Sequence, residues 1–472
     1  MEAWLPAIVL PTILPVAAEF VSVIAAKIMF FRQTFLTFDK NLYLCNVNYQ
    51  LIIHPTNYMK KLILFVMAVT MALNALAQQT LNLGGDISML PQYESANIPY
   101  LRSTGAKIDD VIAYMKTSCK FNSMRVRLFV NPDNSKDISL VQDLEYVKNL
   151  GKRIKDQGLD LMVDFHYSDS WADPSNQTIP ASWKDTSTNA LADSVYAYTK
   201  RCLEYLKANG ATPDFVQVGN EVSYGMLWRN EADRCYSSAS NSTWKRFTTF
   251  LNAGAKAVRE VTPDAKIILH IERAGNASDT KNFFTRMKAN EVDYDIIGLS
   301  YYPFWHKSLS TLSGTLNSLE TAFPDKPVQI VETAYYYQWF PVGETEFDDT
   351  TSTWPGTAAG QKAFIEDLCT ELAKHPNVTG LYYWFPEANG TGVLSNNDPS
   401  NNRGLWDCNT HKINSGLLKL QNFLTEKEAV GIQTIKAPQG TSPIYNLNGQ
   451  RISSLTAPGI YVKDSKKYLK MK

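Results

Sequence analysis

The sequence has no excess charge of either sign: 46 lysine and arginine residues balance 46 aspartate and glutamate residues in a chain of 472. A balanced chain offers no electrostatic surface for nucleic acid or anionic lipid, so we expect neither as a partner. Apolar residues are plentiful, since 44% of the chain is hydrophobic and 12% aromatic, and this composition excludes a disordered protein. We expect one large domain with appendages.

Cysteine is scarce, with six residues and no CxxC spacing, so the sequence predicts no zinc site. Cys45 falls in the N-terminal extension described below, which leaves an odd number in the rest of the chain. A single disulfide and buried free thiols are both compatible with that number.

An export signal begins well inside the chain. Met59 and two lysines are followed by an apolar stretch over 62–73 and by Ala-Leu-Ala at 75–77, which is the order of a secretory signal peptide. Because such a signal works at the start of a chain, we predict that Met59 is the native start and that 59–77 is the signal peptide, cleaved after Ala77.

Residues 1–58 are then a mis-called upstream extension. The alternative is a membrane helix over 5–31, but three prolines and Glu19 within that stretch weigh against it. The residue directly after the predicted cleavage site is Gln78 and not a cysteine, so we expect no lipid anchor, and no membrane span is predicted in the mature chain.

From about residue 81 onward, short apolar or β-branched runs alternate with amphipathic helical stretches such as 140–157 and 190–209. Eight such runs predict an α/β fold of the (β/α)8 TIM barrel type over residues 83–425. A doubly wound sheet is the runner-up, but no glycine-rich phosphate loop follows any early run. The expected strands are 81–87, 123–130, 160–165, 214–219, 266–271, 294–300, 327–331 and 380–384.

Polar and aromatic side chains stand where these runs end. Active sites of (β/α)8 barrels lie at the carboxyl ends of the strands, so we expect these side chains to gather at one mouth. They are Asp86, Arg125, Arg127, Asp164, His166, Asn220, Glu221, His270, Ser300, Tyr301, Tyr302, Glu332 and Trp384.

Glu221 and Glu332 end the fourth and seventh expected strands and are 111 residues apart, from 332 minus 221. At about 37 residues for each βα unit, this separation is three units, which places the two carboxylates on facing sectors of the mouth. Two facing carboxylates suit glycoside hydrolysis, in which one protonates the leaving oxygen and the other attacks the anomeric carbon or activates water. The alternative is that each glutamate is an ordinary loop carboxylate or helix cap.

The motifs around these glutamates resemble a known group of enzymes. VGNE at 218–221 resembles the acid/base signature of the clan A glycoside hydrolases, retaining enzymes with catalytic glutamates on strands 4 and 7. DFHYSDSWADP at 164–174 is similar to the strand 3 signature of glycoside hydrolase family 53, the arabinogalactan endo-β-1,4-galactanases. The resemblance covers nearly all of 83–425 and includes GGDIS at 84–88, RVRLFVNP at 125–132, GLSYYPFW at 298–305, VETAY at 331–335 and NRGLW at 402–406.

This resemblance implies a secreted retaining endo-β-1,4-galactanase that hydrolyses the β-1,4-galactan side chains of pectin (type I arabinogalactan), with no cofactor required for the chemistry. Glu221 is then the acid/base, with a raised pKa, and Glu332 is the nucleophile, ionised at rest beside Arg125. In a retaining enzyme the two carboxyls lie about 5 to 5.5 Å apart. Asn220 is expected to hydrogen-bond the sugar 2-hydroxyl. The other candidate substrate-binding residues are Asp86, Arg125, His166, Asp169, Trp171, His270, Tyr302, Trp305 and Trp384, and the polysaccharide is the expected partner of a monomer.

The chain departs from the family's pattern after three strands. Residues 335–339 read YYYQW where the family usually has Tyr-Pro-Trp, and 383–387 read YWFPE where Trp-Glu-Pro is common. The run HIER at 270–273 also differs from the usual one. These changes leave both glutamates in place but put the outer subsites, and therefore the preferred chain length, in doubt.

Several tryptophans lie just beyond the expected strand ends, where flat faces can stack on sugar rings. Core packing is the alternative role for each of them. They are Trp171, Trp228, Trp305, Trp339 and Trp384, of which Trp305 and Trp384 are the best candidates for sugar subsites.

The loop from 340 to 354 carries a cluster of carboxylates, Glu344, Glu346, Asp348 and Asp349. Such a cluster is a candidate site for a structural calcium ion, although its spacing is not that of an EF-hand. A solvated acidic loop is the alternative.

The pattern changes after residue 424. Residues 427–472 read as short alternating strands punctuated by glycine and proline, which predicts a C-terminal β tail. This tail resembles the C-terminal sorting tails of exported Bacteroidetes proteins, and a small β appendage is the alternative. We therefore expect a periplasmic, cell-surface or extracellular location in a Gram-negative bacterium.

Two other functions stay open. Another clan A endo-glycosidase, of the mannanase or glucanase type, would keep both glutamates but not the segment at 164–174. A non-catalytic glycan-binding protein on the same barrel is the second alternative, and loss of either glutamate would have favoured it.

Overall fold

The computed structural model describes residues 80–341, 353–390, 393–394 and 398–430, together with short strand segments between 433 and 470. The predicted upstream extension, the signal peptide and the acidic cluster at 344–349 lie outside the described residues. Among the residues that are described, no helix is long and apolar enough to cross a membrane.

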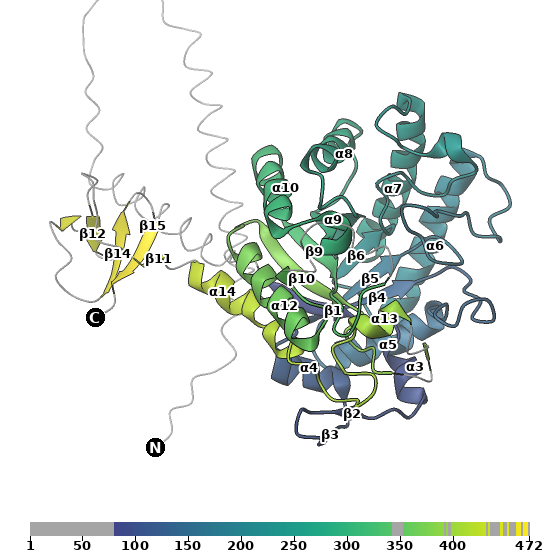
Figure 1. The fold of residues 1–472 in the computed structure, drawn as a ribbon. Helices are drawn as coiled ribbons and strands as arrows, with labels where there is room; N and C mark the ends of the chain where they lie inside the picture. The colour runs from purple at the N-terminus through teal and green to yellow at the C-terminus, as the bar shows by residue number, and fades with distance from the viewer. Residues whose placement is uncertain are drawn as a thin grey trace, which may run out of the picture. The chain divides into compact units, whose positions relative to one another are not determined.

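Eight parallel strands between residues 82 and 384 close into a barrel (Figure 1). Each strand pairs with the next barrel strand along the chain, and the last, β10, closes the barrel by pairing with β1. This arrangement confirms the α/β, (β/α)8 fold predicted from the alternation of runs. The strands are β1 (Asn82–Asp86), β4 (Ser123–Leu128), β5 (Asp160–Phe165), β6 (Phe215–Val218), β7 (Lys266–Ile271), β8 (Ile296–Ser300), β9 (Val328–Thr333) and β10 (Val378–Trp384).

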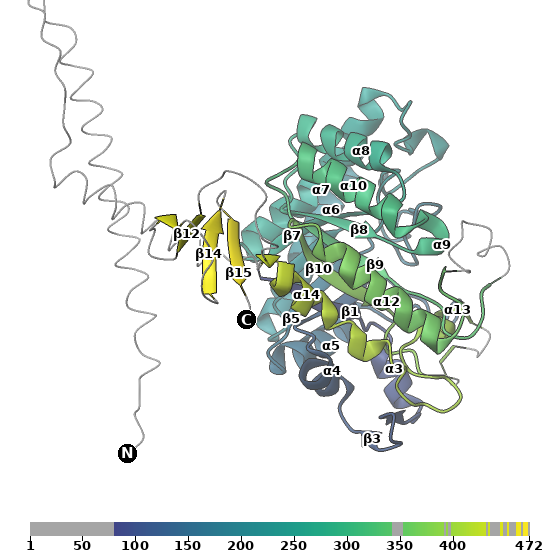
Figure 2. The same cartoon turned by 60° about the vertical axis from the view of Figure 1, so that its left-hand side comes forward.

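Helices between consecutive strands surround the barrel, as Figures 1 and 2 show from two sides. Several begin at a side-chain cap: the Ser187 hydroxyl accepts the backbone N–H of Ala190 at the start of α6, and Asp143 caps α5 in the same way. The surrounding helices are α4 (Val111–Cys119), α5 (Leu144–Asp156), α6 (Thr188–Ala208), α7 (Asn241–Val261), α8 (Ala277–Ala289), α10 (Leu309–Ala322), α12 (Ala358–Ala373) and α14 (Asn422–Val430).

Shorter helices and strands lie in the segments that connect or follow the barrel strands. The strands β2 and β3 pair with each other antiparallel. These elements are α3 (Leu90–Ser95), β2 (Tyr100–Leu101), β3 (Lys107–Ile108), η1 (Glu231–Asp233), α9 (Pro303–His306), α13 (Pro399–Arg403) and η2 (Leu417–Lys419).

The C-terminal segments form a separate sheet with the order β11-β15-β14-β12-β13. Since α14 continues to Val430, the first residues of the tail expected at 427 are helical rather than extended. The role of the tail as a sorting signal stays a prediction. Its strands are β11 (Gln433–Thr434), β12 (Ile444–Asn446), β13 (Arg451–Ile452), β14 (Gly459–Lys463) and β15 (Lys466–Lys470).

The interior of the barrel changes from apolar to polar toward the carboxyl ends of the strands. A small buried cluster fills one level with Met162, Phe215, Ile268, Ile296, Val331 and Tyr382. Side chains on a strand alternate between its two faces, so the residue two positions further on points into the barrel as well. On β5, β6 and β7 these next inward residues are Asp164, Gln217 and His270, all buried. Because side chains alternate along each strand, the strands that fill the core also place polar groups at the mouth of the barrel.

Candidate active site

A register irregularity in β9 positions Glu332. Leu299 of β8 pairs with Ile330, but the next residue, Ser300, pairs with Glu332, so Val331 is an extra residue in β9. Such a bulge changes the direction of the side chains that follow it. Val331 lies in the apolar barrel cluster, while Glu332 joins the polar groups at the mouth. The sequence placed the end of this strand at 331, whereas β9 continues to Thr333.

Glu221 lies three residues beyond the end of β6, in a bend of the chain. Its φ of 46° is in the left-handed region, which a residue with a side chain rarely adopts, and Gly219 two positions earlier has a φ of 92°. The backbone N–H of Val222 donates a 3.0 Å hydrogen bond to the carbonyl of His270 at the end of β7. Backbone strain of this kind collects at functional sites, where surrounding contacts hold it.

Arg125 lies at the centre of the polar cluster and is completely buried. Its Nη2 lies 2.8 Å from Oε1 of Glu332 and 2.8 Å from Oδ2 of Asp164, and its Nη1 lies 2.7 Å from Oδ2 of Asp86. Asp86 also pairs with Arg127 at 3.0 Å. These buried ion pairs fix the position of the Glu332 carboxylate, and removing Arg125 would leave Glu332 and Asp164 without an arginine partner, while Asp86 keeps Arg127.

Asn220 and Gln217 complete the shell around Arg125. The side-chain oxygen of Asn220 accepts a 2.9 Å hydrogen bond from Arg125, and its amide donates at 2.8 Å to the carbonyl of Ala172. Gln217 accepts from Nε of Arg125 at 2.8 Å and donates to Asp164 at 3.1 Å. The orientation of Asn220 beside Glu221 is therefore set before a sugar arrives, and its contact with a sugar hydroxyl stays a prediction.

A hydrogen-bonded chain reaches Glu221 from the other side. The Ser300 hydroxyl donates to Oε1 of Glu221 at 2.6 Å, and His270 Nε2 lies 2.8 Å from that hydroxyl. Nδ1 of His270 lies 3.0 Å from both the side-chain nitrogen of Gln217 and Oδ1 of Asn220, so both ring nitrogens of this imidazole have polar partners. Burial, reinforced by the charge of Arg125, lowers the pKa of His270 well below its usual value, so this imidazole is neutral.

Burial raises the pKa of both glutamates, to different extents. The pKa of Glu221 lies well above its usual value because of burial first and then the negative charges of Glu332 and Glu272. Burial also raises the pKa of Glu332, while Arg125 opposes this rise. The expectation that Arg125 favours the ionised form of Glu332 is correct in direction, but burial outweighs it. Since the cation of Arg125 lies against Glu332, whereas the charges that act on Glu221 are negative, a single proton shared by the pair is favoured on Glu221.

Tyr302 adds a second donor to the Glu332 carboxylate. Its hydroxyl donates to Oε2 at 2.9 Å, while Arg125 holds Oε1. Burial and the charge of Glu332 raise the pKa of Tyr302 well above its usual value, so it remains a donor throughout the working pH range. Each oxygen of Glu332 therefore has its own donor.

The loop after β5 carries two more of the predicted substrate-binding residues, His166 and Asp169. Nε2 of His166 lies 3.0 Å from Asp164, and its Nδ1 accepts the backbone N–H of Ala172 at 3.0 Å. Asp169 accepts the backbone N–H of Ala181 at 2.8 Å, which ties it to the loop itself. Sugar binding by His166 and Asp169 stays a prediction.

Aromatic side chains flank the mouth. The rings of Trp171 and Trp384 are 6.4 Å apart, and Arg127 lies 4.5 Å from the Trp171 ring. Trp305, on α9, is 51% exposed, which is unusual for tryptophan and leaves a flat face open to a ligand. Trp339 stacks on Tyr336 and Trp228 carries Arg234 over its ring, so these two make protein contacts.

Several members of this constellation were not singled out by the sequence as site residues. Ser300 appeared only as a polar residue at a strand end, and Gln217 was not noticed, although a glutamine inside the apolar strand FVQV is a signal of a buried polar role. Glu387, after β10, is completely buried, accepts the backbone N–H of Met89 at 2.9 Å, and has a pKa raised to about 8 by burial and by Asp86. In the part of the chain that the structure describes, no group of three or more potential metal ligands gathers, and the predicted calcium cluster lies outside that part.

The fold and this mouth define a (β/α)8-barrel enzyme with two buried glutamates that have different hydrogen-bond partners, an arrangement suited to cleavage of glycosidic bonds. The sequence model of Glycosyl hydrolase family 53 matches residues 82–421. The chain therefore belongs to Glycosyl hydrolase family 53, as the motifs at 164–174 and 218–221 predicted, and it is a glycoside hydrolase.

Individual relatives agree with this assignment. An uncharacterised protein of Niallia circulans is 34% identical over 321 residues, covering 66% of this chain and 85% of its own length. The arabinogalactan endo-beta-1,4-galactanase A of Aspergillus niger is 31% identical over 315 residues, covering 64% of this chain and 84% of its own. Among solved structures, the GH53 catalytic domain of Ignisphaera aggregans has a TM-score of 0.63 at 27% identity, covering 73% of this chain and 96% of that one. A structure described as one of two fungal beta-1,4-galactanases has a TM-score of 0.61 at 25% identity, covering 72% and 99%.

Proposed function

We propose that the protein is a secreted retaining endo-β-1,4-galactanase that hydrolyses the β-1,4-galactan side chains of pectin. The fungal relatives named as arabinogalactan endo-beta-1,4-galactanases support this substrate class. The family match disfavours the mannanase or glucanase alternative, and the presence of both glutamates disfavours a binding protein without activity. The signal sequence at 59–77 supports export.

One observation carries the assignment of roles. The two carboxylates are held by different partners, Glu332 by Arg125 and Tyr302, and Glu221 by the neutral pair of Ser300 and His270. A carboxylate beside a cation and a phenol is suited to remain ionised and attack, whereas a carboxyl in neutral surroundings is suited to carry a proton.

The first step forms a covalent intermediate. The Glu332 carboxylate attacks the anomeric carbon while the bond from that carbon to O4 of the next sugar breaks, and Glu221 donates its proton to O4. Asn220, already oriented by Arg125, donates a hydrogen bond to the 2-hydroxyl of the reacting sugar as positive charge develops on the ring.

The second step releases the product. Water attacks the anomeric carbon, Glu221 accepts a proton from that water, and the bond to Glu332 breaks. Both carboxyl groups return to their starting states and the product keeps its β configuration. No metal or other cofactor takes part in either step.

Product analysis tests the substrate. The chain from residue 78 onward is incubated with unbranched pectic β-1,4-galactan, β-mannan, cellulose and β-1,3/1,6-galactan, with Glu332→Ala as the control. Galacto-oligosaccharides from the first substrate alone, absent with the variant, are the expected result. Activity confined to another glycan would contradict the substrate, and galactan binding without cleavage would favour the binding-protein alternative.

A further inference from the structure

A short turn after β8 carries one of the two donors to the Glu332 carboxylate. β8 ends at Ser300, and Tyr302 is the residue directly before α9. The Tyr302 hydroxyl donates to Oε2 of Glu332 at 2.9 Å, and the backbone N–H of the preceding Tyr301 donates to the carbonyl of Glu332 at 2.8 Å. The position of the Tyr302 hydroxyl therefore depends on how the backbone of this turn is held.

His306 holds that backbone through two reciprocal hydrogen bonds. The backbone N–H of Tyr302 donates to Nδ1 of His306 at 2.9 Å, and the backbone N–H of His306 donates to the carbonyl of Tyr302 at 2.7 Å. The Tyr302 side chain makes no cap for α9, which has only four residues. A side chain that reaches back to the N–H of the residue before a helix acts as the second half of a capping box does. His306 therefore ties α9 to Tyr302.

This geometry requires a neutral imidazole. A backbone N–H can only donate, so Nδ1 of His306 carries a lone pair and the ring proton is on Nε2. An imidazolium has a proton on both nitrogens and cannot accept from Tyr302. Burial, followed by the positive charge of Arg273, lowers the pKa of His306 to about 4, so the ring is neutral above that pH.

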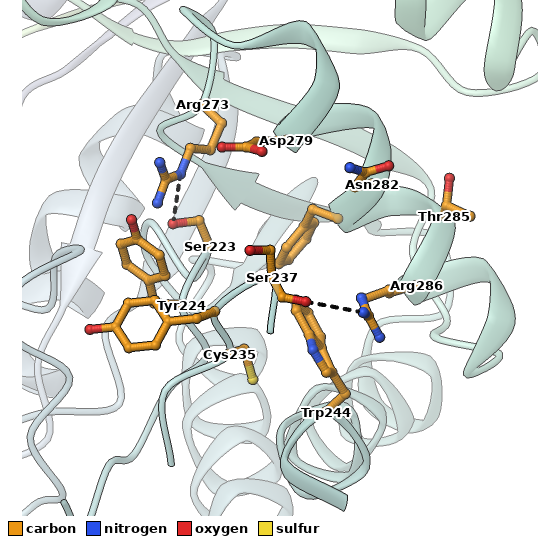
Figure 3. A pocket seen from close by; sticks show the side chains of 12 residues that line it. Ser223, Tyr224, Cys235, Ser237, Trp244, Arg273, Asp279, Asn282, Thr285 and Arg286 are labelled. Atoms are coloured by element: carbon orange, nitrogen blue, oxygen red, sulfur yellow. Dashed lines mark hydrogen bonds between the residues drawn. The ribbon is translucent and has the colours of Figure 1, made fainter. Parts of the chain in front are cut away.

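The loop after β7 supports His306 from behind. Arg273 lies in this loop, where its Nε donates to the Ser223 hydroxyl at 3.3 Å (Figure 3). At Gly275, two residues further on, a Cβ would lie 2.8 Å from Cα of His306 and 2.8 Å from its carbonyl oxygen. Only glycine allows the two backbones to approach this closely. The turn therefore packs against a backbone that leaves it little room to move.

The Tyr302 hydroxyl matters for Glu332 because other neighbours act in the opposite direction. Burial raises the pKa of Glu332, and two of the nearby carboxylates add to the rise, whereas Arg125 and the Tyr302 hydroxyl oppose it. If the hydroxyl moved away, more of Glu332 would be protonated at a given pH. The charged groups around Glu332 are Arg125 on β4, Asp164 on β5, Asp86 on β1 and Glu221 after β6.

We propose that His306 is a positioning residue of the active site, whose Nδ1 holds the backbone of Tyr302 and thereby keeps the Tyr302 hydroxyl on the Glu332 carboxylate. This role rests on the proposed function, in which Glu332 is the nucleophile and has to be ionised. His306 acts on Glu332 through Tyr302, and the neutral imidazole is the form that does so.

Two variants at this position differ in the acceptor that they offer. His306→Phe keeps an aromatic ring but cannot accept the N–H of Tyr302, whereas His306→Asn has a side-chain oxygen at the same distance from Cβ as Nδ1. With His306→Phe we expect the acid limb of the kcat/KM profile on galactohexaose to move to higher pH, because Glu332 loses its phenol donor. On that limb kcat/KM should fall about tenfold, the factor that about 1.4 kcal/mol represents. His306→Asn should restore the acid limb of the unmodified protein.

A second background separates positioning from a general loss of stability. Tyr302→Phe already lacks the hydroxyl, so adding His306→Phe to it should not move the acid limb any further. A purely structural role for His306 would lower the melting temperature in both backgrounds and leave the acid limb of each in place.

Nitrogen-15 NMR of the unmodified protein tests the hydrogen bond without requiring any substitution at Tyr302. The chain contains six histidines, and the ring signals of His306 are those that the spectrum of His306→Asn lacks. We expect Nδ1 without a proton and Nε2 with one, and no titration of this ring between about pH 5 and 8.

The outcomes separate this proposal from the proposed function. If the unmodified protein does not cut β-1,4-galactan, the galactanase function is contradicted, while the NMR spectrum still decides whether Nδ1 accepts. A proton on Nδ1 of His306 would overturn the proposal. So would an acid limb that stays in place in a folded His306→Phe variant, or one that His306→Phe moves equally in the Tyr302→Phe background.

Discussion

The Ser300 hydroxyl donates a 2.6 Å hydrogen bond to Glu221. In the barrel, the backbone of the same serine pairs with Glu332. One residue on β8 thus binds the Glu221 carboxylate through its side chain and pairs with the backbone of Glu332 through its main chain. The relative position of the two glutamates is therefore set by the carboxyl ends of β8 and β9 and by the turn that follows β6.

Ser300→Ala removes the only hydroxyl donor described for Glu221 within the part of the chain that the structure covers. This hydrogen bond lowers the pKa of Glu221, so its loss should raise that pKa further. Activity requires Glu221 to be protonated in the free enzyme, and it is lost as the pH rises through this pKa. We expect the basic limb of the kcat/KM profile to move to higher pH and kcat to fall about tenfold.

The control for this variant is Ser300→Thr, which keeps a hydroxyl. A basic limb that stays in place in Ser300→Ala would show that this limb does not report Glu221.

Tyr302→Phe should change the acid limb of the pH profile of kcat/KM. The Tyr302 hydroxyl lowers the pKa of Glu332, so removing it raises that pKa. Activity requires Glu332 to be ionised and is lost as the pH falls through its pKa, so the acid limb should move to higher pH. The measurement is the pH profile of kcat/KM, and an acid limb that moves to lower pH would contradict the assignment of Glu332 as nucleophile.

Arg125→Met should destabilise the protein as well as inactivate it. The arginine lies within 2.8 Å of Glu332, Asp164 and Asp86, all in buried positions. Removing one partner of a buried ion pair costs about 3 to 5 kcal/mol. Chemical denaturation should show a loss of at least this size, and a variant of unchanged stability would mean that the cluster is not held by this cation.

Glu387→Gln should change how stability depends on pH. Burial, followed by Asp86, raises the pKa of Glu387 to about 8, above its value in an unfolded chain of about 4.3. The folded form therefore holds a proton that the unfolded form releases, and this contribution to stability is present below about pH 4 and is lost as the pH rises toward 8. A neutral glutamine has no such loss, so the Tm of the variant relative to the parent should rise between pH 5 and 8. A constant difference in Tm over this range would contradict the raised pKa.

Much of the barrel was predictable because its signals are local. Apolar runs of strand length alternate with amphipathic helices, and the polar residues that end the runs meet at one mouth, as the position of Arg125 beside Asp86 and Glu332 shows. The roles predicted for Glu221 and Glu332 from their spacing and their motifs stay predictions.

Other features depend on contacts that a single sequence does not encode locally. The bulge at Val331 is a property of the pairing between β8 and β9, so the sequence placed the strand end one residue before Glu332. Gln217 looked like part of an apolar strand, and its role is evident only when Arg125 and His270 are seen beside it.

The most direct test of the central claim is the configuration of the azide products formed by two variants from 2,4-dinitrophenyl β-galactobioside. Glu221→Gly suits the left-handed backbone at this position, where φ is 46°, and Glu332→Ala truncates the proposed nucleophile. Added azide should restore activity to both, giving the β-glycosyl azide with Glu221→Gly and the α-glycosyl azide with Glu332→Ala. The reverse pair of configurations would exchange the two roles, and full activity of either variant without azide would contradict the account.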